Sequence, residues 1–150
     1  MAAHSINEFL TEDHACLDEL LESFREQKRD QPAEAKETLK RFAAALYRHL
    51  QWEEATLFPL FEQKTGQTGL TGTLRSEHEE IREWLTALSD KVEQGGLDSD
   101  HEEKMLVEEL GGHNAREEYA LYPQLDKLLT DEERRRVFEV MSGEAAFPAS

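Results

Sequence analysis

Two stretches of the sequence repeat each other, and this repeat constrains the fold more than any other feature. Residues His49–Pro59 read HLQWEEATLFP, and residues His113–Pro123, 64 positions later, read HNAREEYALYP. Both stretches have His, Glu, Glu, Leu and Pro in the same places, with Tyr122 in the second where the first has Phe58. Self-similarity at a fixed offset indicates that a chain is built from copies of one structural unit. We therefore expect an internal two-fold repeat.

The same offset relates two earlier histidines. His14 in EDHACLDELL aligns with His78 in SEHEEIREWL, again 64 positions later. Four of the six histidines therefore fall into two pairs with identical spacing. The remaining two, His4 and His101, lie outside the repeat among polar neighbours, and we expect them at the surface. Each half of the chain thus supplies one early histidine and one His-x-x-x-Glu motif.

The His-x-x-x-Glu motifs pair His49 with Glu53 and His113 with Glu117. Residues four apart on an α-helix point about 40° from one another, so each pair lies on one face, one turn apart. Leucines on the same face as His49 place that pair against a core. An uncompensated buried carboxylate costs several kcal/mol, so each glutamate must be protonated, paired with a cationic side chain or bound to a metal. Four converging histidines favour the metal.

The chemistry of these side chains narrows the choice of metal. Imidazole and carboxylate together suit iron, manganese or zinc, and helical bundles use such ligands for dimetal centres. Glu54 and Glu118 follow their histidines by five residues, about 140° around the helix, so we expect them to face solvent or the edge of a neighbouring helix. Cys16 is the only cysteine, and no thiolate cluster is available for structural zinc. The expected metal ligands are His14, His49, Glu53, His78, His113 and Glu117.

Apolar spacing and chain breakers predict five helices. The first two run over residues 5–28 and 32–64, and the glycine-containing run Thr65–Thr73 is expected to be a loop. Leu74–Leu88 mark a third helix that ends at Gln94-Gly95-Gly96, a fourth spans residues 99–128, and a short fifth begins near Thr130. Capping boxes are expected at three helix starts. Their residues are Ser5 with Glu8, Ser99 with Glu102, and Thr130 with Glu133.

Long helices joined by short connections predict an all-α, antiparallel, up-down-up-down four-helix bundle. We expect residues 1–150 to form one domain, with a core over residues 5–128 and a short capping helix and loose tail over residues 129–150. Pro59 and Pro123 each remove a helical hydrogen bond about six residues after a ligand glutamate. We expect them to bend their helices around the metal site.

Composition limits the classes of partner. The chain has 33 Asp and Glu against 17 Lys and Arg, and a net charge of -16, so it repels nucleic acid and anionic membranes and favours multivalent cations. The N-terminal residues show no signal peptide, and no window holds the roughly 20 apolar residues that would cross a bilayer. The single cysteine excludes an intrachain disulfide and fits the cytoplasm. We expect a monomer or a weak homodimer.

The order of the motifs resembles the hemerythrin-like, or HHE cation-binding, family: a His, a His-x-x-x-Glu, a His and a second His-x-x-x-Glu, on four helices over residues 5–128. In this family an aromatic residue and a proline follow the His-x-x-x-Glu motif, and both copies of the motif are followed by them here. Ferritin-like di-iron proteins are the rival bundle, but their Glu-x-x-His motif is missing. The residues three positions before the repeated histidines are Thr11, Leu46, Arg75 and Leu110.

The resemblance implies a non-haem di-iron centre with an oxo or hydroxo bridge. His14 and His49 would lie near one iron and His78 and His113 near the other, with Glu53 and Glu117 bridging the two irons. Zinc or manganese are possible substitutes. Oxygen-carrying hemerythrins have a fifth histidine where this chain has Arg82, so one ligand would be missing. Asp18 or a water could complete the set.

Three functions remain open from the sequence. The first is sensing, carrying or detoxifying a small oxidant such as O2, peroxide or nitric oxide at the iron pair. The second is iron homeostasis or repair of iron-sulfur centres. The third is a metal-stabilised bundle that serves as an interaction module. Whether the protein is an enzyme is not decided, and no catalytic residue is assigned.

Overall fold

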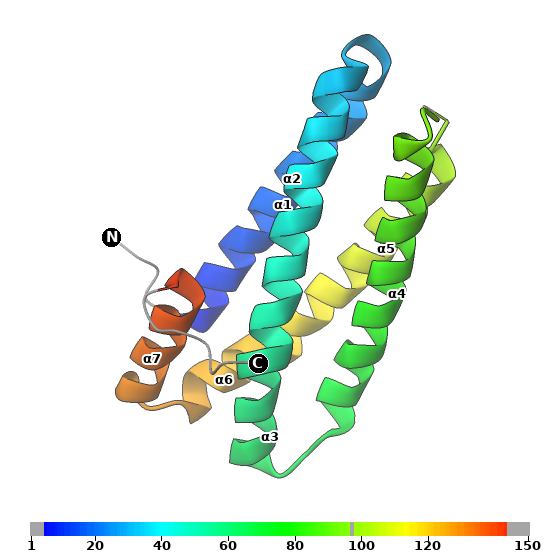
Figure 1. Cartoon of the computed structure of the whole chain (residues 1–150). Helices are drawn as coiled ribbons and strands as arrows, with labels where there is room; N and C mark the ends of the chain where they lie inside the picture. The colour runs from blue at the N-terminus through cyan, green and yellow to red at the C-terminus, as the bar shows by residue number, and fades with distance from the viewer. Residues whose placement is uncertain (1–4, 97, 144–150) are drawn as a thin grey trace.

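Four antiparallel helical segments form two hairpins that pack into an up-down-up-down bundle (Figure 1). The computed structural model describes residues 5–96 and 98–143. In the first hairpin, α1 (Ile6–Asp30) precedes a segment made of α2 (Pro32–Trp52), the π-helix η1 (Glu53–Leu57) and α3 (Phe58–Thr65). In the second, α4 (Gly69–Glu93) precedes α5 (Asp100–Arg116), the π-helix η2 (Glu117–Leu121) and α6 (Tyr122–Leu128). A short fifth helix, α7 (Asp131–Ser142), follows. The predicted all-α bundle and its internal repeat are confirmed.

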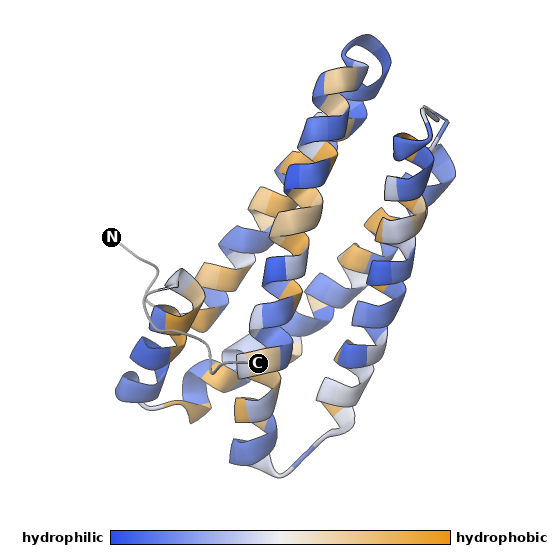
Figure 2. Ribbon diagram, in the orientation of Figure 1, coloured by the Kyte–Doolittle hydropathy of each residue, from blue (hydrophilic) through white to orange (hydrophobic). Residues whose placement is uncertain are grey.

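Two separate apolar clusters fill the bundle. The distal cluster lies toward the α1–α2 and α4–α5 turns, and the proximal cluster lies among α3, α6, α7 and the start of α1. In α1, Leu10 belongs to the proximal cluster and Leu17 to the distal one, with the buried His14 between them. Figure 2 shows polar and apolar residues alternating from turn to turn along the long helices. A polar layer therefore divides the core where the repeated histidines lie.

The helix starts confirm two of the expected caps. Thr130 and Glu133 form a full capping box at α7, and the Ser5 hydroxyl accepts a hydrogen bond from the Glu8 backbone N–H at 3.0 Å. The third expectation is wrong, because the Ser99 side chain caps no backbone N–H. Ser99 instead donates a hydrogen bond to the fully buried Glu103, a carboxylate that requires polar partners once it is removed from water.

Replacing Thr130 by Ala should destabilise the protein by about 1 kcal/mol, because the N–H of Glu133 loses its acceptor at the start of α7. For a chain of this size that corresponds to a fall of roughly 2–4 °C in the midpoint of thermal unfolding, measured by calorimetry. The variant Thr130→Ser keeps the hydroxyl acceptor and should melt close to the wild type. Equal destabilisation by both substitutions would contradict the capping role.

The expected loop over Thr65–Thr73 is wrong for its second half. The connection is short, and α4 already begins at Gly69. Glycine costs a helix about 1 kcal/mol relative to alanine, but burial outweighs that cost here. Thr71 is fully buried and donates a hydrogen bond to Glu62 at 2.5 Å, and Leu74 packs in the proximal cluster. Tertiary contacts therefore extend the helix through a sequence that indicates a break.

A π-helical turn, rather than a simple proline kink, interrupts each motif-bearing segment. The Phe58 N–H donates to the carbonyl of Glu53, and the Tyr122 N–H donates to that of Glu117, each five residues back. The prolines follow directly, within the first two positions of α3 and α6. The wider turn relieves the clash that a proline ring would have inside a regular helix. Both π-turns start at an expected ligand, which places the irregular backbone at the site.

Candidate metal centre

Four histidine rings from the four long helices converge in the polar layer between the apolar clusters. His14, His49, His78 and His113 are each no more than 4% exposed. The Nε2 atoms of His14 and His49 lie 3.2 Å apart, and those of His78 and His113 also lie 3.2 Å apart. Each pair combines the two helices of one hairpin. Each half of the sequence repeat thus contributes one pair of imidazole nitrogens that face each other.

Two fully buried glutamates connect the pairs. Glu53 directs one carboxylate oxygen to His49 Nε2 at 3.3 Å and the other to His78 Nε2 at 2.9 Å. Glu117 lies 3.3 Å from His14 Nε2 through one oxygen and 3.1 Å from His113 Nε2 through the other. Each carboxylate therefore spans both histidine pairs.

The six expected ligands fall into two groups of four, within which one donor atom from each residue lies within 4.8 Å of the others. Both groups share the two glutamates, and each has one histidine pair of its own. The first group is His14, His49, Glu53 and Glu117. The second group is Glu53, His78, His113 and Glu117.

An outer carboxylate holds the far nitrogen of every histidine ring. Asp13 lies 2.7 Å from His49 Nδ1, and Glu77 lies 2.9 Å from His113 Nδ1, each within one hairpin. Between the hairpins, Glu118 contacts His14 Nδ1 at 2.7 Å and Glu54 contacts His78 Nδ1 at 2.6 Å. An ionised carboxylate can only accept a hydrogen bond, so each Nδ1 carries the hydrogen. All four Nε2 atoms are thereby directed inward as donors for a metal, in the arrangement typical of metal-binding histidines.

Sequence reasoning missed part of this outer layer. Glu54 and Glu118 are half-buried, and the second of the two alternatives expected for them, contact with a neighbouring helix, is confirmed, because both side chains reach a ring on the other hairpin. Asp13 and Glu77 were not recognised, although the 64-residue offset relates them and each directly precedes an expected ligand. Their acidic character at the same place in both halves was the available signal.

The buried charges shift the pKa of the central groups. Burial lowers the pKa of His49, but the charge of Glu53 and the hydrogen bond to Asp13 outweigh it and raise the pKa to about 10. Burial also lowers the pKa of His113, but the charge of Glu117 and the hydrogen bond to it outweigh burial and raise the pKa to about 11. Burial raises the pKa of Glu53, yet the neighbouring His49 holds it well below its usual range. With no metal bound, protons on His49 and His113 supply the positive charge that the carboxylates require.

The donor atoms fit a pair of metal ions. Four imidazole nitrogens and two carboxylates form a set suited to iron, manganese or zinc. Glu117 Oε2 is buried and has no hydrogen-bond partner beyond its 3.1 Å contact with His113 Nε2. Facing Nε2 lone pairs repel unless a cation or proton lies between them. Cys16 is exposed and Asp18 lies outside both groups of donors. His101 is exposed as expected, whereas His4 and residues 144–150 of the tail lie outside the described residues.

The two halves of the site, which the sequence repeat relates, differ in the side chains around the ligand candidates. Tyr122 is fully buried, and its hydroxyl reaches Glu53 Oε2 at 2.5 Å and Glu117 Oε1 at 2.8 Å. At the equivalent position, the Phe58 ring lies 5.3 Å from that of His78 and offers no donor. Arg82, at the position of the fifth histidine of oxygen carriers, donates a hydrogen bond to Glu54 at 2.9 Å. Arg82 thus supports the carboxylate that orients His78.

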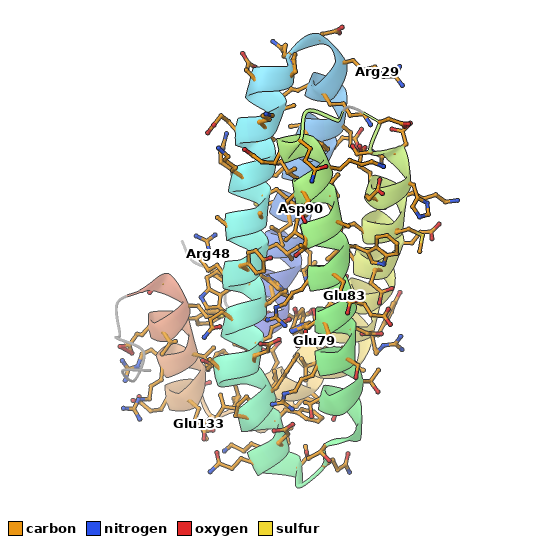
Figure 3. The ribbon with its side chains drawn as sticks, turned by 45° about the vertical axis from the view of Figure 1, so that its right-hand side comes forward. Arg29, Arg48, Glu79, Glu83, Asp90 and Glu133 are labelled. Carbon is orange, nitrogen blue, oxygen red and sulfur yellow. The ribbon has the colours of Figure 1, made fainter. Side chains whose placement is uncertain are left out.

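Replacing Glu54 by Gln should weaken metal binding at the His78–His113 half by about 10–100-fold, because the His78 ring loses its charged acceptor. The other half should keep its affinity, since Glu54 does not touch it. Competition of Zn²⁺ between the protein and a chromogenic chelator measures both affinities. Glu83→Gln is a matched control, because Glu83 is an exposed carboxylate on α4 (Figure 3). Equal weakening by both variants would contradict an orienting role for Glu54.

Comparison with known proteins adds one finding. The model of the hemerythrin HHE cation binding domain family matches residues 5–125, which include all six converging ligand candidates. Neither the curated proteins nor the solved structures that were compared gave a match. The order His, His-x-x-x-Glu, His, His-x-x-x-Glu and the helical bundle agree with the matched family. The chain therefore belongs to the hemerythrin HHE cation-binding family.

Proposed function

We propose that this cation-binding protein holds two iron ions and uses them to bind or react with O2, peroxide or nitric oxide. The observation that carries the proposal is the pair of four-donor groups that share Glu53 and Glu117. His14 and His49 would hold one ion, and His78 and His113 the other. A bound iron pair supplies redox chemistry and positions for a small ligand. Zinc or manganese would fit the same donors but differ in redox behaviour.

The protein's own residues prepare the site in two ways. The apolar clusters on either side of the polar layer limit access of water, which strengthens electrostatic interactions within it. The outer carboxylates fix the orientation of every ring before metal binds, so little rearrangement is needed. The residues thus provide a preformed set of donors.

The test is to load the protein with Fe²⁺ without oxygen and to record metal content and visible absorption. We expect about two irons per chain and a change in absorption after adding O2, peroxide or azide. Iron binding without any spectral response to these ligands would overturn the oxidant-binding proposal. Binding of Zn²⁺ or Mn²⁺ alone would overturn the choice of iron.

Iron homeostasis is the second candidate, and a groove on the surface favours it. A cavity of about 390 Å³ between α1 and α5 reaches His14, with Asp18 and Glu118 on its wall. Such an acidic path would let a cation exchange with the centre. Fast transfer of iron to an external chelator, with no turnover of peroxide, would favour this candidate. Tightly held iron with turnover would favour the first.

An interaction module, in which the metal only stabilises the bundle, stays the third candidate function.

We further propose that the protein acts as a monomer or weak homodimer. The net charge of -16 leads us to expect neither nucleic acid nor membrane as a partner. Among the described residues, no helix is long and apolar enough to cross a membrane. Cytoplasmic location stays a prediction from the single cysteine.

A further inference from the structure

Tyr122 places a phenol oxygen among the donors of one half of the site. Beyond its contacts with the two shared glutamates, its Oη lies 3.3 Å from His14 Nε2 and 3.4 Å from His49 Nε2. The oxygen is therefore close to a donor atom of all four members of the first group. A tyrosine that only filled space in the core would not require this convergence.

These distances match those between donors bound to the same ion. Atoms bound at 2.0–2.2 Å to one tetrahedral or octahedral ion lie roughly 2.8–3.6 Å from their neighbours. Three of the four distances from the Tyr122 oxygen fall in this range, and the fourth is the 2.5 Å contact with Glu53. The hydroxyl has one hydrogen, so it can donate to only one of the two carboxylates at a time.

The other half has no equivalent donor. Phe58 occupies the place of Tyr122 in the repeat, and its ring packs on His78. Arg82, a cationic side chain near this half, is paired with Glu54 and Glu79. Within residues 5–96 and 98–143, the protein thus offers five donors in the first half and four in the second.

We propose that Tyr122 is a fifth protein ligand of the metal held by His14 and His49, so that the two metal positions are chemically unequal. The proposal rests on the metal centre proposed above and deepens it. Ligation by ferric iron replaces the O–H bond of the phenol with an O–Fe bond, and the proton passes to water. No electron is transferred in this step. Phenolate is an established iron ligand in proteins.

The test compares the ferric wild type with Tyr122→Phe. The wild type should hold about two irons, show a phenolate-to-iron charge-transfer band and give tyrosinate ring modes in resonance Raman spectra. Tyr122→Phe should keep most of its iron but lose the band and the ring modes. Tyr119→Phe is the matched control, because Tyr119 lies three residues away and is 87% exposed. It should leave the spectrum unchanged.

The reciprocal variant Phe58→Tyr introduces a phenol in the other half and should add a second tyrosinate contribution. Wild-type protein with two irons and no tyrosinate modes would overturn the ligand role of Tyr122 while leaving the proposed iron centre intact. Persistence of the modes in Tyr122→Phe would overturn it as well. Failure of the wild type to bind iron would overturn the proposed centre and this inference together.

Discussion

Replacing Glu53 by Gln weakens metal binding at both positions, whereas replacing His14 by Ala weakens it at one. Glu53 belongs to both groups of donors, and its two oxygens face different histidine pairs. The amide removes the negative charge that both ions share, replaces one of the two donor oxygens by an NH2 group that cannot bind a metal, and leaves a weaker, neutral oxygen in the other place. We expect a loss of more than about 100-fold in affinity at both positions, above the 10–100-fold typical of outer partners.

Metal content after desalting, together with a Zn²⁺ titration, measures the result. The wild type should retain about two ions, His14→Ala about one and Glu53→Gln close to none. Glu54→Gln serves as the control, because it removes the neighbouring carboxylate but leaves both bridging glutamates in place. Retention of one tight ion in Glu53→Gln would show that this carboxylate serves a single metal, contrary to the geometry.

Removing the metal lowers the thermal stability, and the loss grows as the pH rises from 7 toward 10. Ligand at about 1,000 times its dissociation constant stabilises a protein by about 4 kcal/mol. For about 150 residues, this corresponds to a shift of roughly 10 °C in the unfolding midpoint. The effect is large because the two fully buried carboxylates, Glu53 and Glu117, depend on the metal or on protonated histidines for their charge balance.

The direction of the pH dependence follows from the raised histidine pKa values. The folded pKa of His49 is about 10 and that of His113 about 11, against an ordinary value of 6.5. Their stabilisation of the metal-free protein is fully present below about pH 6.5, and it is lost as the pH rises through the folded values. A bound metal replaces these protons, and its affinity increases with pH.

Calorimetry of chelator-treated and Zn²⁺-loaded protein at pH 7 and pH 9 measures the gap between the two forms. Zn²⁺ avoids redox changes during heating, and Glu53→Gln should show almost no gap at either pH. A gap that stays constant or narrows at pH 9 would contradict the assigned histidine protonation.

A thermal unfolding midpoint that is unchanged in His113→Ala, although the variant has lost metal, would argue against the purely structural role of an interaction module.

Much of the centre could be predicted from residue spacing. Four positions separate His49 from Glu53 and His113 from Glu117, so a helix directs each pair to one face, whatever the rest of the fold does. The 64-residue offset then indicated two equivalent halves. Spacing along one helix could not predict which groups on other helices complete the site. Tyr122 shows this limit, because the sequence alone marks it only as an aromatic residue in place of Phe58.

The sequence by itself determined the helical bundle, the repeat and the six side chains that converge, because helical periodicity fixes which residues share a face. Only the tertiary structure decided how the two halves combine. Glu118 and Glu54 reach across to histidines of the opposite hairpin, and the Tyr122 hydroxyl lies among donors from two other helical segments. These contacts depend on how the hairpins pack and on the π-turns that begin at Glu53 and Glu117, and local propensity encodes neither.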